Sequence, residues 1–144
     1  MQTIDKVQQE IIDEFNIYDD WMDKYSLIIE QGNAIKPIDN KYKTPENIIK
    51  GCQSRVWLQA DYKDGRLFFQ AESDAIIVKG LLALVLRVFN NRTPEEIINT
   101  ELKFMTEIGL TEHLSPTRSN GLLSVIKQIR FYAIAFKAKE DKLV

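Results

Sequence analysis

The sequence predicts an α+β fold in which a small antiparallel sheet, built on a β-hairpin, packs against several helices. Two stretches of alternating apolar and polar residues flank an Asp64-Gly65 pair, which is a strong signal for a tight hairpin turn. Stretches with apolar residues at helical spacing lie before and after this hairpin. The order helices, hairpin, helices is typical of α+β proteins rather than of parallel α/β proteins.

Two amphipathic helices are predicted to open the chain. In the first, over residues 4–15, apolar side chains recur every three or four residues with charged residues between them. The second, over residues 18–29, carries Asp19 and Asp20 in its first turn, where negative charge is favourable. Gly32 is placed to end this helix in a left-handed cap.

The hairpin is predicted to have its strands at residues 56–63 and 67–72. The segment before it, residues 33–47, shows no sustained periodicity and is predicted to be a connecting loop. Two strands alone are marginally stable in water, so a third strand or a helical cover has to complete the sheet. Residues 47–50 are the nearest candidate for a third strand.

A central helix is predicted over residues 76–88, because apolar side chains surround it on most sides. Ser73 and Asp74 offer capping oxygens just ahead of it. The run from Thr93 to Glu96 matches the capping-box pattern, with proline at the first helical position, and starts another short helix.

The C-terminal third is predicted to contain one or two short helical turns over residues 102–110 and then a long helix that begins at Ser115-Pro116. Residues 137–144 are mostly charged and are predicted to fray. Residues 1–144 are expected to form one domain, because their number and 44% hydrophobic content suit a single core. One face of the long helix carries the apolar stripe Leu122, Ile126, Ile129, Ala133 and Phe136.

Composition excludes several classes of protein. With one cysteine and one histidine, the chain cannot form an internal disulfide or a zinc site built from Cys and His alone. The net charge of −2 gives no electrostatic reason to bind nucleic acid. The longest apolar-rich stretch, residues 76–88, falls short of the ~20 residues that cross a bilayer. The N-terminus has no secretory signal, so we expect a cytoplasmic protein with a reduced thiol.

The single cysteine, Cys52, lies in a polar segment next to Gly51, which is typical of an accessible loop. A lone cysteine is often only a small packing residue, and that alternative stays open. A cysteine hydrolase would need His113 as its base, whereas attack of a thiolate on sulfur needs no built-in base. Lys50 and Arg55 are close enough in sequence to lower the pKa of the thiol modestly, although solvated charges are the favoured interpretation of both.

Three separated motifs resemble those of the SufE family, the sulfur-acceptor proteins of cysteine desulfurases. They are GCQSRVW at residues 51–57, SDAIIVKGL at 73–81 and HLSPTRSNGL at 113–122. The similarity extends from about Trp21 to the end of the last helix. The chain departs from the common pattern at Glu72, where aspartate is frequent, and at Thr117, where serine is frequent.

This resemblance implies a fold like that of the SufE and IscU proteins, and a carrier rather than an enzyme. Cys52 is expected to take sulfur from the persulfide of a desulfurase, to stimulate that enzyme, and to pass the sulfur to an iron-sulfur cluster scaffold. Pyridoxal phosphate is expected on the desulfurase only, and no cofactor, metal, nucleic acid or membrane partner is expected for this chain. The alternative is a non-catalytic adaptor whose Cys52 is structural. A cluster scaffold is disfavoured because a cluster usually takes several thiolates.

The resemblance also assigns roles around the cysteine. Asp74 is expected to cap the central helix, to tune the mobility of the cysteine loop, or both. Arg118 lies in a first helical turn, where a cation is unfavourable, so we expect it to dock the partner, to stabilise the thiolate or to join an internal ion pair. His113 is expected to be a structural or docking residue. The remaining residues of the expected site loop are Gly51, Gln53 and Ser54. Nothing in the sequence predicts a substrate pocket.

Overall fold

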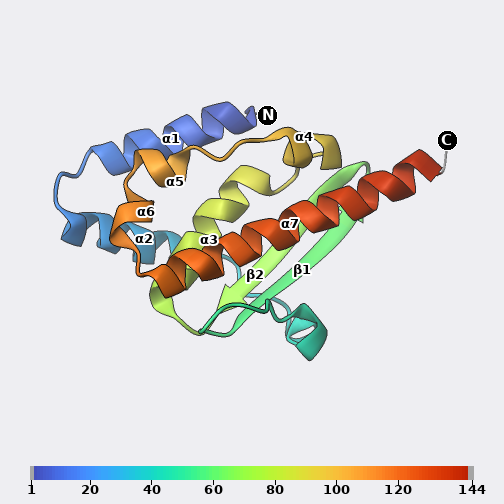
Figure 1. Cartoon of the computed structure of the whole chain (residues 1–144), viewed down its shortest axis with the longest axis horizontal. Helices are drawn as coiled ribbons and strands as arrows, with labels where there is room; N and C mark the ends of the chain where they lie inside the picture. The colour runs from blue at the N-terminus through green and yellow to red at the C-terminus, as the bar shows by residue number, and fades with distance from the viewer. Residues whose placement is uncertain (1, 143–144) are drawn as a thin grey trace.

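The computed structural model describes residues 2–142 and confirms the predicted α+β class (Figure 1). Its elements in chain order are α1 (Ile4–Asn16), α2 (Trp21–Ala34), the 3-10 turns η1 (Asn40–Tyr42) and η2 (Pro45–Asn47), β1 (Val56–Lys63), β2 (Arg66–Ser73), α3 (Ile76–Phe89), α4 (Pro94–Asn99), α5 (Phe104–Glu107), α6 (Leu110–His113) and α7 (Pro116–Lys142). None of the helices described over residues 2–142 is long and apolar enough to cross a membrane.

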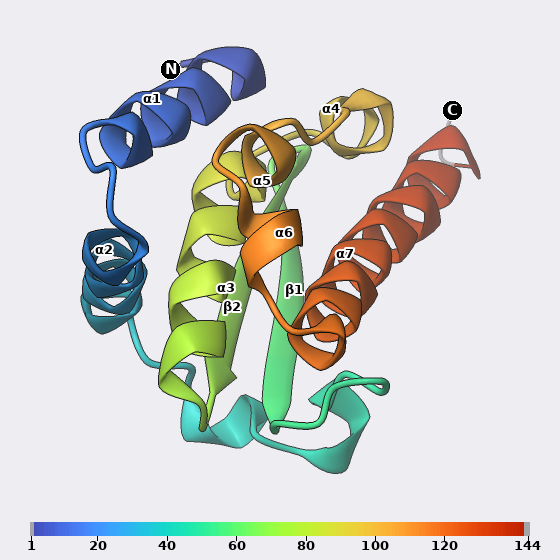
Figure 2. The same ribbon diagram turned by 60° about the vertical axis from the view of Figure 1, so that its left-hand side comes forward.

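Helix α3 occupies the centre of the fold. Figure 2 shows α1 and α2 on one side of it and α7 on the other, with the hairpin running alongside. Because α3 has neighbours on nearly every side, most of its side chains are buried, as its apolar sequence predicts. The largest of these buried side chains are Leu81, Leu82, Leu84 and Phe89.

Two glycines let α2 and α3 approach each other closely. A Cβ atom added to Gly80 would lie 2.1 Å from the carbonyl oxygen of Ile28, and one added to Gly32 would lie 2.8 Å from the backbone nitrogen of Gly80. The predicted left-handed cap at Gly32 is therefore wrong. Helix α2 continues past this residue to Ala34, and Gly32 is used for helix packing instead of helix termination.

The hairpin forms as predicted, with β1 and β2 antiparallel and Asp64 and Gly65 both at positive φ in the turn. The predicted third strand at residues 47–50 is reduced to a single bridge between Ile48 and Trp57. Among residues 2–142 the sheet thus has two strands, and helical cover completes it.

The capping predictions have different outcomes at two helices. Thr93 and Glu96 form the predicted capping box at the start of α4. At α3 the cap residue is Ala75, which makes no side-chain capping bond, so the prediction that Asp74 caps this helix is wrong. The Ser73 hydroxyl accepts a hydrogen bond from the backbone N–H of Ala75 just outside the helix.

The end of α7 is more ordered than its charged sequence predicts. Within the range 137–144 that we expect to fray, the chain is helical as far as Lys142, and the last two residues lie outside those described. The physical reason is a contact with the hairpin. The ring of Tyr62 stacks on Phe136 at 5.1 Å between centroids, and its hydroxyl is hydrogen-bonded to Glu140.

Replacement of Gly80 by alanine is expected to lower the free energy of unfolding by about 2 kcal/mol or more, because the new methyl group meets fixed backbone of α2. Helix propensity alone would raise stability by up to about 1 kcal/mol, so the sign of the change identifies the cause. Urea denaturation followed by circular dichroism measures it.

The matched control is Gly65→Ala in the hairpin turn, where nothing lies within 4 Å of the added atom and only the positive φ is strained. We expect a loss of about 1 kcal/mol there. Equal losses in the two variants would show that the α2–α3 contact is not tightly packed.

Candidate functional site

Cys52 lies on the loop between η2 and β1, at the end of the hairpin away from its turn (Figure 1). Gly51 precedes it at φ +92°, a conformation that other residues rarely adopt. A Cβ atom added to Gly51 would also lie 2.8 Å from the hydroxyl oxygen of Ser124 on α7. Both observations explain why glycine stands before the cysteine: the loop turns sharply there and rests directly on α7.

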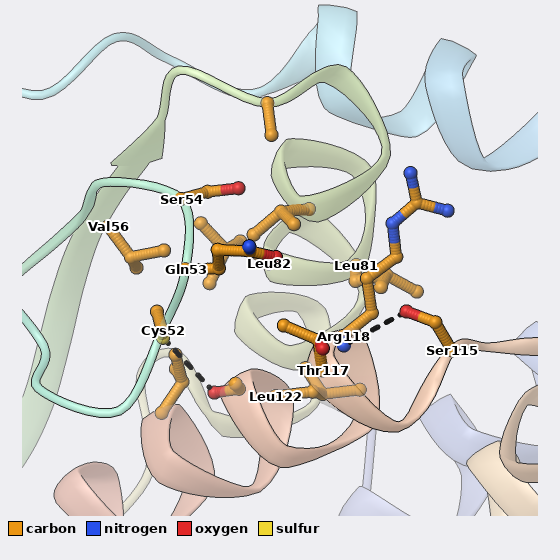
Figure 3. A pocket seen from close by; sticks show the side chains of 14 residues that line it. Cys52, Gln53, Ser54, Val56, Leu81, Leu82, Ser115, Thr117, Arg118 and Leu122 are labelled. Atoms are coloured by element: carbon orange, nitrogen blue, oxygen red, sulfur yellow. Dashed lines mark hydrogen bonds between the residues drawn. The ribbon is translucent and has the colours of Figure 1, made fainter.

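The thiol of Cys52 points inward, toward the first turns of α7. Its Sγ donates a hydrogen bond to the backbone carbonyl oxygen of Gly121 at 3.4 Å, which is the dashed line from Cys52 in Figure 3. The side chain is half-buried and packs against the hydrophobic core. The loop is thus accessible while the sulfur is partly shielded.

A pocket of about 400 Å³ opens beside the cysteine, between the loop, α3 and α7 (Figure 3). No motif in the sequence predicted it, because its walls come from three separated segments. Gln53, Ser54, Thr117 and Arg118 contribute polar groups to its lining. The apolar part of the lining includes Val56, Val78, Leu81, Leu82, Leu122 and Val125.

Burial raises the pKa of the Cys52 thiol above its ordinary value, and no nearby charge opposes this effect. Lys50 and Arg55 are both exposed, which fits the favoured interpretation of solvated charges, and neither is a cause of the shift in the pKa of Cys52. In the free protein the sulfur is mainly a protonated thiol at neutral pH. Such a group is a weak nucleophile until it loses its proton.

Asp74 ties the far end of the cysteine loop to the start of α3. Its carboxylate accepts a hydrogen bond from the backbone N–H of Arg55 at 3.1 Å, and its own N–H donates to the carbonyl oxygen of Arg55 at 3.3 Å. Asp74 is exposed, so water competes for this carboxylate. Of its two predicted roles, the structure excludes capping and gives it a direct contact with the loop.

Arg118 lines the pocket from the first turn of α7 and is exposed. Its backbone N–H donates to the hydroxyl oxygen of Ser115, while its guanidinium group extends away from Cys52 (Figure 3). Within residues 2–142 it forms none of the internal ion pairs that we considered. The free cation at the pocket is available to a second molecule.

His113 is held apart from the pocket. Its ring stacks on Trp21 at 3.9 Å between centroids, and its backbone carbonyl oxygen accepts a hydrogen bond from the Tyr25 hydroxyl at 3.0 Å. It is not one of the residues that line the pocket beside Cys52. These contacts hold His113 in place, and its position outside the pocket lining argues against it as a base for Cys52. Over residues 2–142 no group of His, Cys, Asp and Glu side chains is arranged to hold a metal.

Alkylation of Cys52 by iodoacetamide is expected to show a pH midpoint above the ~8.5 of a free thiol, because burial favours the protonated form. Unfolding in urea should return the midpoint to the free value. The raised pKa also means that the thiol stabilises the fold below its unfolded pKa, and that this contribution is lost as pH rises through the folded pKa. A midpoint below the free value in folded protein would contradict the geometry.

Comparisons with known proteins agree with this arrangement. Residues 9–133 match the family described as "SufE: Fe-S metabolism associated domain". An uncharacterized SufE-like protein of Rhizobium etli is 41% identical over 126 residues, which cover 84% of this chain and 85% of that protein. The solution structure of a hypothetical protein from Thermus thermophilus has a similar fold, with a TM-score of 0.74, 17% identity, and coverage of 90% of this chain and 94% of that one. Membership of the family implies a role in sulfur transfer with a cysteine desulfurase, within iron-sulfur metabolism. The chain belongs to the SufE family.

Proposed function

We propose that the protein accepts a persulfide sulfur on Cys52 from a cysteine desulfurase, passes it to an iron-sulfur cluster scaffold in the cytoplasm, and so accelerates the desulfurase. The observation that carries this proposal is the position of Cys52: a half-buried thiol on a loop, beside a pocket with polar groups at its edge. A carrier has to present its sulfur to two partners in turn, and a loop is the part of a fold that most readily does so.

The transfer exchanges one sulfur–sulfur bond for another. The Cys52 thiol first loses its proton to solvent or to a base of the partner. The thiolate then attacks the outer sulfur of the partner's persulfide, a new bond forms between Cys52 and that sulfur, and the bond inside the original persulfide breaks. The partner's cysteine leaves with the electron pair as a thiolate, so the step needs no external oxidant or reductant.

The chain acts as a carrier, because Cys52 returns to a thiol only when the sulfur is handed on. Pyridoxal phosphate is assigned to the desulfurase, which has to form the first persulfide. Shielding of the free thiol is useful for such a carrier, since exposed thiolates are oxidised most readily. Docking then has to move the cysteine loop outward, away from α7.

Three residues support the docking part of the proposal. Arg118 offers a free cation at the pocket. Asp74 holds the loop through two hydrogen bonds to the backbone of Arg55, and the one to its exposed carboxylate can be broken by a partner at little cost. The third is His113, whose exposed ring on α6 stacks on the half-buried Trp21 of α2.

A binding adaptor with a structural cysteine is the second candidate. The contact between the Cys52 thiol and the core favours it, because a small apolar residue in that position serves packing alone. The two candidates differ in whether sulfur appears on the chain.

Incubation with a cysteine desulfurase and free cysteine, without reductant, is expected to add one reducible sulfur to this protein. Intact-protein mass spectrometry detects the addition, and Cys52→Ser should remain unmodified because it lacks the acceptor. The rate at which the desulfurase produces alanine should rise when the wild-type protein is added, and Cys52→Ser should not produce this increase. If the wild-type chain stimulates the desulfurase but stays unmodified, the adaptor function replaces the carrier function.

Removal of the free cation by Arg118→Ala is expected to raise the concentration needed for half-maximal desulfurase stimulation by about tenfold or more, which is the effect of losing one hydrogen bond to a charged group. The maximal rate at saturation should change less. Titration of the variant against a fixed amount of desulfurase separates these two quantities. Ser119→Ala, one residue along the same helix, is the matched control and should leave both unchanged.

A further inference from the structure

We infer that Gly121 is a positioning residue for sulfur transfer: it holds the unloaded, protonated Cys52 and releases the cysteine once the sulfur ionises or is loaded. This inference deepens the proposed function and rests on it for its biological meaning. Its physical part concerns only the loop and α7.

The first argument is steric. A Cβ atom added to Gly121 would lie 3.3 Å from the Cys52 sulfur and 3.8 Å from both the Cα and the Cβ of Cys52. The sulfur therefore lies closer to this turn of α7 than an ordinary contact with a side chain would allow. Gly121 itself is helical and buried, and it does not have a positive φ, so its backbone conformation does not require glycine. Contact with the cysteine is the requirement that remains.

The second argument is the direction of the hydrogen bond. The Gly121 carbonyl oxygen can only accept, so the 3.4 Å contact is favourable only while Cys52 carries a proton on Sγ. A thiolate in this position would face an oxygen lone pair. A persulfide has no hydrogen on its inner sulfur, and its outer sulfur needs additional space about 2 Å away. Both forms lose the contact that holds the thiol against α7.

No charged group near the cysteine offers a competing explanation. On the loop, Lys50 and Arg55 are exposed; ahead of α3, Asp74 is exposed and bonded to the backbone of Arg55; on α7, Arg118 is exposed. No charged group is among the causes that raise the pKa of the Cys52 thiol. When Cys52 loses its proton, the interaction that changes is therefore the hydrogen bond to the Gly121 carbonyl oxygen, not an ion pair with a nearby charged group.

The consequence is that the position of the cysteine loop depends on whether Cys52 carries a transferred sulfur. The empty carrier keeps its thiol tucked against α7, where it reacts slowly with oxidants. A loaded carrier has no hydrogen bond to Gly121 and presents its sulfur away from that turn. Sulfur loading itself then favours hand-over to the next protein.

The direct test is the rate at which iodoacetamide alkylates Gly121→Ala at pH 8. The added methyl group would lie 3.3 Å from the sulfur, closer than an ordinary contact, so the sulfur has to shift by a few tenths of an ångström and its hydrogen bond to Gly121 lengthens. We expect alkylation about threefold faster than in wild type, the factor that a loss near the lower end of the range for an ordinary hydrogen bond produces. The pH midpoint should also move down. Asn120→Ala is the matched control: it raises helix propensity in the same turn without adding an atom. An unchanged alkylation rate in a folded Gly121→Ala protein overturns the inference.

A second measurement uses no glycine variant and so does not depend on how Gly121→Ala folds. Amide hydrogen exchange of residues 50–55 is compared between wild type and Cys52→Ser, whose hydroxyl can donate to Gly121 and does not ionise in this range. The ratio of the two rates removes the intrinsic pH dependence of exchange. We expect this ratio to rise as pH passes through the pKa of the thiol. A constant ratio contradicts the inference.

The loaded form is tested with a mimic. Treatment with methyl methanethiosulfonate converts Cys52 to a methyl disulfide, whose inner sulfur carries no hydrogen, and exchange of residues 50–55 should rise at neutral pH. Unchanged exchange overturns the release on loading. None of these experiments contains a desulfurase. If sulfur transfer fails in the desulfurase experiment, the proposed function is lost but the Gly121 contact is not. If the alkylation and exchange experiments fail, the Gly121 inference is lost but the proposed function is not.

Discussion

The close contact between α2 and α3 is the constraint on which the rest of the structure depends. It exists because Gly80 and Gly32 bring backbone against backbone, with no space for even one methyl group. Helix α3 is thereby fixed at the centre, where it supports β2 on one side and contacts α7 on another (Figure 2). The shape of the pocket beside Cys52 depends on the position of α3, because Leu81 and Leu82, which directly follow Gly80, form part of the pocket wall. A shift of α3 would change the space beside Cys52.

Two opposing requirements meet at Cys52. A sulfur acceptor needs a thiolate, yet burial raises the pKa of this thiol and keeps it protonated. The contacts that hold the loop are weak: the thiol hydrogen bond to Gly121, and two hydrogen bonds between Arg55 and Asp74, one of them to the exposed Asp74 carboxylate. Each is worth about 1 kcal/mol in a typical protein, so a docked partner can displace the loop with a small part of its binding free energy. Under the proposed function, the thiol is therefore activated in the complex with the partner rather than in the free chain.

Much of the fold could be predicted from local sequence, because hairpin turns, capping boxes and amphipathic periods depend on neighbouring residues. The failures share a physical cause: they depend on contacts between distant segments. Gly32 was predicted to cap a helix because its contact with Gly80 could not be seen in the sequence. Asp74 was predicted to be an N-cap because the hydrogen bond from the backbone N–H of Arg55 to its carboxylate could not be seen either. For the same reason the sequence indicated Cys52 as the proposed sulfur acceptor but not its environment. The pocket, the raised pKa of Cys52 and its contact with Gly121 arise only when the loop meets α7.

The central claim is that docking, and not the intrinsic reactivity of the free protein, makes Cys52 an acceptor. The most direct measurement compares two donors of the same chemistry: the persulfide on a desulfurase and a small-molecule persulfide, each reacted with this protein under identical conditions. The account predicts loading at least about a hundredfold faster per mole of donor from the desulfurase, because docking both exposes and orients the thiol. Equal rates from the two donors would contradict it, since Cys52 would then be neither shielded in the free chain nor released by its partner.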